Sequence, residues 1–197
     1  MKDASDRFEV RLAGSGGQGL ILAGVILAEA VAIYDGRNAI QTQSYGPEAR
    51  GGASKSEVIV SDGRIDFPKV MLADVLLALS QEACDTYFHG LKPKGLLVVD
   101  SDLVERAPTS KAVGVPVTKM AIEATGKAIT ANIVGLGLIG GLTSVVSRQA
   151  LEKAVTERAP KGTAEMNLKA LAAGWEKALE IKEASRSVRP GPRRRES

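Results

Sequence analysis

A glycine-rich hexapeptide separates an apolar stretch that predicts a strand, over 8–13, from one that predicts a helix, over 20–33. Its residues are Gly14, Ser15, Gly16, Gly17, Gln18 and Gly19. Glycines allow a tight turn there and let the helix begin close to the strand. The free N–H groups at such a helix N-terminus favour an anion. The pattern therefore predicts the first strand–turn–helix unit of an α/β domain, with a turn suited to a phosphate or carboxylate.

Strands and helices alternate along the rest of the chain. Further strands are expected at 38–43, 56–60, 75–79, 96–100 and 113–117, and helices at 81–89, 119–125, from about 131, 151–158 and 167–182. Such alternation favours a mostly parallel sheet covered on both faces. A hairpin-type turn at 61–64, leading to Ile65 and Phe67, predicts an antiparallel strand at an edge. The expected fold is a single Rossmann-like, three-layer α/β domain over residues 1–184.

The net charge of +3 arises in the last thirteen residues, 185–197. They hold five arginines against Glu196, and the remainder of the chain has 21 basic against 22 acidic residues. This segment has two prolines and no apolar periodicity, so we expect a disordered, solvated tail. A basic run this short does not indicate a nucleic-acid partner.

Cysteine and histidine each occur once, as Cys84 and His89. One thiol excludes an intrachain disulfide and an iron–sulfur cluster held by this chain alone, because such clusters need about four thiolates. One histidine also excludes a histidine-rich metal site. We interpret Cys84 as a small apolar helix residue and His89 as a surface or packing residue.

The uncharged stretch 128–147 has the length of a membrane span, about 20 residues. It contains five hydroxyl or amide side chains and four glycines, which favours a buried helix instead. The N-terminus has no apolar signal region. We therefore expect a cytoplasmic protein that does not enter the membrane.

A second glycine-bearing loop follows the strand expected at 38–43. It includes Tyr45, Gly46, Pro47, Glu48, Arg50, Gly51 and Gly52. In a parallel sheet it would emerge at the same edge as the first loop, where ligands bind in such folds. Arg50 is a planar cation suited to phosphate or carboxylate, and Tyr45 could stack or pack. An ordinary loop ion pair between Glu48 and Arg50 is an equally open interpretation.

The first loop alone also fits two other interpretations. A dinucleotide site needs an acidic residue about 20 positions on, near the end of the second strand, but 40–44 has none. An independent NAD(P)- or flavin-binding oxidoreductase remains an alternative. A further alternative is a structural assembly subunit, in which the glycines serve only the packing of helix against strand.

The two loops together, GSGGQG and QSYGPEARGG at this spacing, resemble the gamma subunit of 2-oxoacid:ferredoxin oxidoreductases. The similarity extends from about Val10 to Lys177. It includes Ala73-Asp74, LLVVD at 96–100 and Ala131-Asn132. SYGPEARGG on a short independent chain favours the 2-oxoglutarate enzyme within this family. The arginine-rich tail departs from the family's usual end.

The resemblance implies a function within a complex. Enzymes of this family decarboxylate a 2-oxoacid oxidatively with coenzyme A, giving acyl-CoA, CO2 and reduced ferredoxin. Thiamine diphosphate, Mg and iron–sulfur clusters would lie on partner subunits: alpha, beta and, as a further candidate, a ferredoxin-like delta subunit. This chain alone would hold no catalytic group and no cofactor.

The resemblance also implies positioning roles for the two loops. They would line the coenzyme A crevice and the face presented to the thiamine-bearing partner. Backbone N–H groups of Gly16, Gly17 and Gly19, with Arg50, are the candidates for a phosphate contact. Asn132 is a further candidate, as a helix N-cap that could reach the crevice.

Overall fold

The structure is a computed structural model that describes residues 7–45 and 53–187. Six strands form one sheet in the order β2-β3-β1-β4-β5-β6. Their bounds are β1 Phe8–Ser15, β2 Asn38–Tyr45, β3 Ala53–Ser61, β4 Ala73–Ala78, β5 Leu91–Asp100 and β6 Val113–Val115. The sequence predicted each strand, although β5 begins five residues before the stretch expected from its apolar run.

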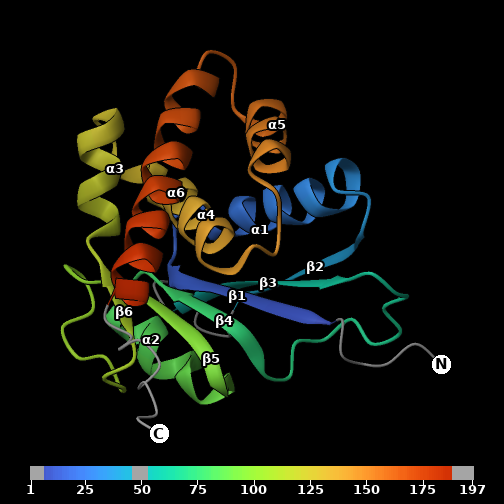
Figure 1. The fold of residues 1–197 in the computed structure, drawn as a ribbon, viewed down its shortest axis with the longest axis horizontal. Coiled ribbons are helices and arrows are strands. Elements are labelled where there is room, and N and C mark those ends of the chain that lie inside the picture. The colour runs from blue at the N-terminus through green and yellow to red at the C-terminus, as the bar shows by residue number, and fades with distance from the viewer. Residues whose placement is uncertain (1–6, 46–52, 188–197) are drawn as a thin grey trace, which may run out of the picture.

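The helices form two unequal layers, one on each face of the sheet (Figure 1). The upper layer consists of α1 Leu20–Glu29, α3 Val117–Thr125, α4 Ala131–Thr143, α5 Arg148–Arg158 and α6 Ala164–Ser187. Among the described residues, α2, Gln81–Tyr87, is the one helix of the lower face. Short turns of π or 3-10 helix follow α1 (Ala30–Tyr34) and α2 (Phe88–Gly90) and precede α4 (Ala128–Thr130). The predicted three-layer α/β fold is therefore confirmed.

Strand directions divide the sheet into two parts. The strands β1, β4, β5 and β6 are parallel, whereas β3 is antiparallel to β1 and β2 is antiparallel to β3. The predicted antiparallel edge is confirmed, but its predicted place is wrong. The turn at 61–64 leads into a loop, 62–72, and not into a strand at Ile65 and Phe67. The antiparallel strand at the edge is β2, which pairs with β3.

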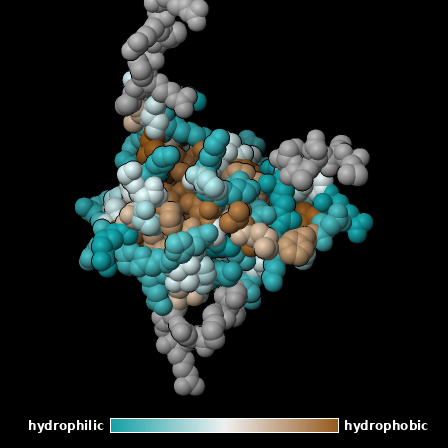
Figure 2. Space-filling model, turned by 90° about the horizontal axis from the view of Figure 1, so that it is seen from below, coloured by the Kyte–Doolittle hydropathy of each residue, from teal (hydrophilic) through white to brown (hydrophobic). Residues whose placement is uncertain are grey.

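The upper helices enclose the larger core. Alternate residues of the central strands, including Val10, Leu12, Val75 and Leu77, point into it and are at most 1% exposed. The lower face buries a smaller set around Leu76, with Cys84 of α2. Seen from below, apolar side chains show in the middle of this face between hydrophilic margins (Figure 2). The strand β4 is thus buried on both sides, as its continuous apolar sequence predicted.

The uncharged segment forms α4, which lies within the upper layer and is buried from Ala131 to Gly141. The prediction of a buried helix is confirmed. No helix in the described residues has the length and apolar character needed to cross a bilayer. At the carboxyl end of the chain, α6 continues to Ser187, so residues 185–187 of the predicted tail are helical. Residues 188–197 lie outside the described residues.

Glycines let α4 and α6 approach until their backbones touch. A Cβ on Gly137 of α4 would lie 2.3 Å from the carbonyl oxygen of Leu171, and one on Gly174 of α6 would lie 2.0 Å from that of Val134. Distances below 3.0 Å to backbone atoms cannot be relieved by a side-chain rotation. These glycines therefore set the distance between the two helices.

We expect Gly174→Ala to lower the free energy of unfolding by at least ~2 kcal/mol, because the added methyl must force the helices apart. Urea denaturation would measure the loss. Gly114→Ala in β6 is the matched control, since a Cβ there meets only the Ser101 Cβ at 3.6 Å. Equal stability of the two variants would contradict this account of the helix pair.

Candidate functional site

The first glycine loop lies between the carboxyl end of β1 and the start of α1, as predicted. Gly17 and Gly19 have φ values of 86° and 72°, in the left-handed region that favours glycine. Gly19 occupies the N-cap position of α1, and no side chain in the part of the chain that the structure describes caps this helix end. Gly16, Gly17 and Gly19 thus form a turn that leaves the first backbone N–H groups of α1 without a side-chain acceptor among the described residues.

Gln18 fixes the shape of this loop from within. Its Oε1 accepts a hydrogen bond from the Ser15 N–H at 2.8 Å, and its Nε2 donates to the Leu79 carbonyl at 3.1 Å. A Cβ on Gly14 would lie 2.1 Å from the same Oε1, so glycine is required for the amide to fit. Both ends of the Gln18 amide are therefore used to join the loop to the end of β4.

Asn132 holds the loop from the side of α4. Its Nδ2 donates to the Gly19 carbonyl at 2.9 Å, and its Oδ1 accepts from the Ile133 N–H at 2.9 Å. The side chain is buried, and a Cβ on Gly19 would lie 2.6 Å from Nδ2. The predicted N-cap role is wrong, because Thr130 occupies that position of α4. The structure brings Asn132 to the glycine loop all the same, from 113 residues away in sequence.

Gly16 and Gly17 expose their backbone to solvent. A Cβ on either would meet no described residue within 4 Å. The N–H groups of Gly16, Gly17 and Gly19 make no hydrogen bond to any residue within 7–45 or 53–187. Together with the helix dipole of α1, they form a surface suited to an anion.

The second loop begins and ends beside the first. Ser15 pairs with Ala53, and Tyr45 pairs with Ser54, so β1 and β2 end at the same edge of the sheet although β3 lies between them. The predicted convergence of the two loops on one edge is therefore confirmed for their ends. The candidates Gly46, Pro47, Glu48, Arg50, Gly51 and Gly52 lie outside the described residues, as does the side chain of Tyr45, and their roles stay predictions.

This edge is also where the sheet changes the face that its helices cover. The helix after β1, α1, lies above the sheet, whereas the helix after β4, α2, lies below it (Figure 1). Ligands of open α/β sheets bind in the crevice that such a change creates at the carboxyl ends of the strands. No residue of β2 is a carboxylate, which argues against a ribose-binding dinucleotide site.

Beneath this edge lies a cluster of charged and aromatic residues that the sequence did not predict. Arg11 and Glu57 form a buried ion pair with 2.7 Å between Nε and Oε1, and Lys55 Nζ lies 3.1 Å from the same Oε1. The Tyr87 hydroxyl donates to the Ala53 carbonyl at 3.2 Å. Burial raises the pKa of Tyr87, and Arg11 opposes that shift. The only sequence signal was the alternation of Lys55, Glu57 and Ile59 along one strand.

The chain's single cysteine and histidine lie apart from the glycine loop. Cys84 is buried in α2, and this burial raises the pKa of its thiol, so it is a packing residue as predicted. His89 is exposed and contacts Phe88, also as predicted. Among the described residues, no group of three or more His, Cys, Asp or Glu side chains is placed to hold a metal ion.

We expect Asn132→Ala to leave the Gly19 carbonyl without its side-chain donor and to loosen the start of α1, at a cost of about 1–3 kcal/mol. Hydrogen exchange of the α1 amides would report the change locally. Asn167→Ala is the control, because Asn167 makes the same kind of side-chain bond, to the Thr163 carbonyl at 2.9 Å, but far from the loop in sequence. Equal exchange at α1 in both variants would contradict the role of Asn132.

Comparison with known proteins agrees with this architecture. The family model described as pyruvate ferredoxin/flavodoxin oxidoreductase matches residues 9–177. The "2-oxoglutarate synthase subunit KorC" of Methanocaldococcus jannaschii is 52% identical over 179 residues, covering 89% of this chain and 96% of that protein. Further proteins of that name are 40–48% identical. The "Ketoisovalerate oxidoreductase subunit VorA" of Methanothermobacter thermautotrophicus is 36% identical, and the match covers 87% of this chain but only 36% of VorA.

A solved structure shares the fold as well. The gamma subunit of a keto/oxoacid ferredoxin oxidoreductase from Geobacter sulfurreducens is 54% identical, with a TM-score of 0.81 over 88% of this chain and 97% of that subunit. The resemblance of the two glycine loops is therefore confirmed by whole-length similarity. The chain belongs to the pyruvate ferredoxin/flavodoxin oxidoreductase family, as a gamma-type subunit.

Proposed function

We propose that this chain acts in a complex that converts 2-oxoglutarate and coenzyme A to succinyl-CoA and CO2 while reducing ferredoxin, and that its glycine loop lines the coenzyme A crevice. The assignment of 2-oxoglutarate is supported by the order of identities. The KorC proteins are 40–52% identical, whereas the ketoisovalerate relative is 36% identical. The chain also covers nearly the full length of the KorC proteins.

The observation that carries the crevice assignment is the backbone of the first loop. Gly16 and Gly17 expose N–H groups at the start of α1, at the edge where the helices change faces. Coenzyme A carries phosphate groups, and helix N-termini with glycine turns bind phosphates well. The proposed role is to fix the position of the cosubstrate, with Arg50 as a second phosphate contact.

The reaction itself needs groups that this chain would receive from its partners. Thiamine diphosphate supplies the carbanion chemistry, and iron–sulfur clusters accept single electrons. One cysteine with a raised pKa cannot supply the thiolates of a cluster. The contribution of this chain is to hold the cosubstrate in place and to exclude water by closing one side of the crevice.

We expect the tagged chain to copurify with larger subunits from its native host under anaerobic conditions. The eluate should reduce a low-potential dye in the presence of 2-oxoglutarate and coenzyme A. Activity on another 2-oxoacid would correct the substrate and keep the complex. A chain that emerged alone and bound NAD(P) or flavin would contradict the proposal.

We expect Gly16→Val to raise the KM for coenzyme A in the assembled complex about tenfold or more, with a smaller change in kcat. A Cβ at Gly16 meets nothing within 4 Å among residues 7–45 and 53–187, so we expect the valine to interfere with a group that approaches the loop from outside. The thermal midpoint of the chain should therefore stay unchanged, which separates this effect from misfolding.

Gly114→Ala serves as the control, since Gly114 lies in the edge strand β6 away from the loop. Size-exclusion chromatography of each variant complex would show whether Gly16→Val blocks assembly instead. An unchanged KM in a fully assembled Gly16→Val complex would argue against any contact between this loop and coenzyme A.

A further inference from the structure

The loop between β3 and β4, residues 62–72, exposes three large apolar side chains. Phe67 is 52% exposed, Met71 66% and Leu72 45%. Single exposed apolar residues are common on protein surfaces, but three within six residues on one loop are a feature of interaction sites. This loop contains no helix or strand, so its own backbone bonds do not explain its shape.

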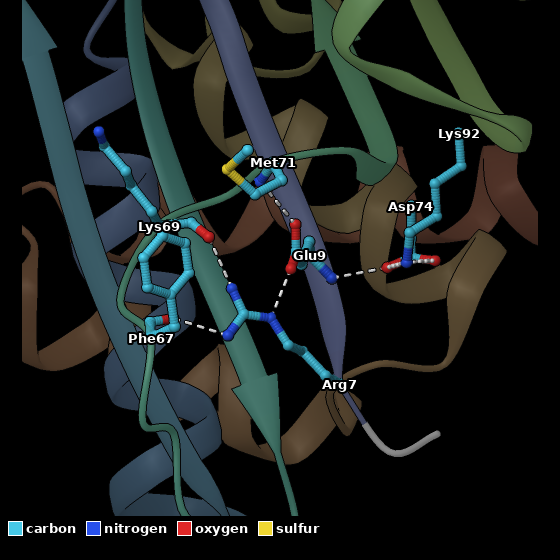
Figure 3. Close-up of polar contacts among 7 residues, drawn as sticks. All are labelled: Arg7, Glu9, Phe67, Lys69, Met71, Asp74 and Lys92. Carbon is cyan, nitrogen blue, oxygen red and sulfur yellow. Dashed lines mark hydrogen bonds and ion pairs between the residues drawn. The ribbon is translucent and has the colours of Figure 1, made fainter. Parts of the chain in front are cut away.

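Arg7 fixes the loop by binding its backbone. The two terminal guanidinium nitrogens donate to the Phe67 and Lys69 carbonyls, each at 2.6 Å. The Arg7 Nε donates to the carboxylate of Glu9 on the adjacent strand, β1 (Figure 3). A fork of this kind holds two carbonyls in a defined orientation.

Glu9 completes the support from the sheet. Its Oε2 accepts a hydrogen bond from the Met71 N–H at 3.2 Å, although the residue is only 6% exposed. Its own N–H donates to Asp74 Oδ2 at 2.8 Å, and Lys92 Nζ lies 2.8 Å from the same carboxylate (Figure 3). Burying the Glu9 carboxylate costs free energy unless it is paired and hydrogen-bonded. Its bonds to Arg7 and Met71 offset this cost and hold the loop backbone in place.

The loop turns one apolar side chain inward and the others outward. Val70 is buried against Ile59 and Ala73, between the exposed Phe67 and Met71. The inward residue and the Arg7–Glu9 bonds hold the backbone from two sides. Side chains on a preorganised backbone bind a partner without the entropy cost of ordering a loop.

This loop lies at the opposite end of the sheet from the glycine loop. Glu9 is near the start of β1 and Ser15 at its end, which places the two regions roughly 20 Å apart along the strand at about 3.3 Å per residue. A partner bound at 62–72 would therefore leave the coenzyme A crevice open. The loop's two acidic residues are ion-paired, Asp62 with Arg37 and Asp66 with Arg64, whereas Lys69 has no ion pair among the described residues.

We propose that loop 62–72 is a docking surface for another subunit of the same complex. This companion subunit is the one equivalent to the part of VorA that lies outside its match to this chain. The proposal rests on the function proposed above. Its basis is that this domain makes up only 36% of VorA, so that in that relative the same fold is continuous with further chain. The companion would present an apolar recess for Phe67 and Met71 with a carboxylate near Lys69.

The test measures association of the purified full-length chain with the companion subunits. We expect the double substitution Phe67→Ser and Met71→Ser to weaken binding about a hundredfold, roughly tenfold for each side chain lost from the centre of an interface. Both side chains are more than half exposed, so the thermal midpoint should not fall. Ile33→Ser is the matched control, because Ile33 is 65% exposed in a different part of the surface.

Sedimentation of the chain alone completes the experiment. Unchanged affinity of the double variant would overturn the docking surface while leaving the proposed function intact. A wild-type homodimer that the double substitution dissociates would assign the loop to a second copy and overturn the companion. A wild-type chain that bound no companion subunit would contradict the proposed function itself.

Discussion

The backbone contact between α4 and α6 is the constraint on which the rest of this structure depends. Gly137 and Gly174 let the two helices approach without intervening side chains, and Gly135 lets α4 settle onto Leu77 of the sheet. This fit places α4 at the centre of the upper layer, where it is buried along most of its length. Its first turn is then fixed relative to β1, and with it the position of Asn132.

The glycine loop is consequently shaped by segments that are far apart in sequence. Asn132 holds the Gly19 carbonyl from α4, and Gln18 joins Ser15 to the Leu79 carbonyl at the end of β4. Asn132 is buried and Gln18 is half-buried, and hydrogen bonds from both ends of each amide favour one conformation of the loop. Gln18 and Asn132, whose contact with a ligand stays a prediction, thus support the loop that exposes the glycine N–H groups.

Local pattern was sufficient to predict the strand–turn–helix unit at 14–19, the buried strand β4 and the buried helix α4. The partners of Gln18 and Asn132 could not be predicted, because each bond joins residues 61 or 113 positions apart. The hairpin was misplaced for a related reason. Ser61-Asp62-Gly63 has the composition of a strand turn, but Arg7 and Glu9, distant in sequence, bind the following backbone and keep it out of the sheet.

The central position of β1 determines when this protein can fold during its synthesis. The strand is made before the other five, yet Phe8 pairs with Val60 and Val10 with Val75, and the helix layer that covers it ends at Ser187. The strand cannot pair before β3 and β4 have been made, and the helix layer over its apolar side chains is complete only with α6. We therefore expect the growing chain to expose apolar surface to which chaperones can bind until α6 has been synthesised.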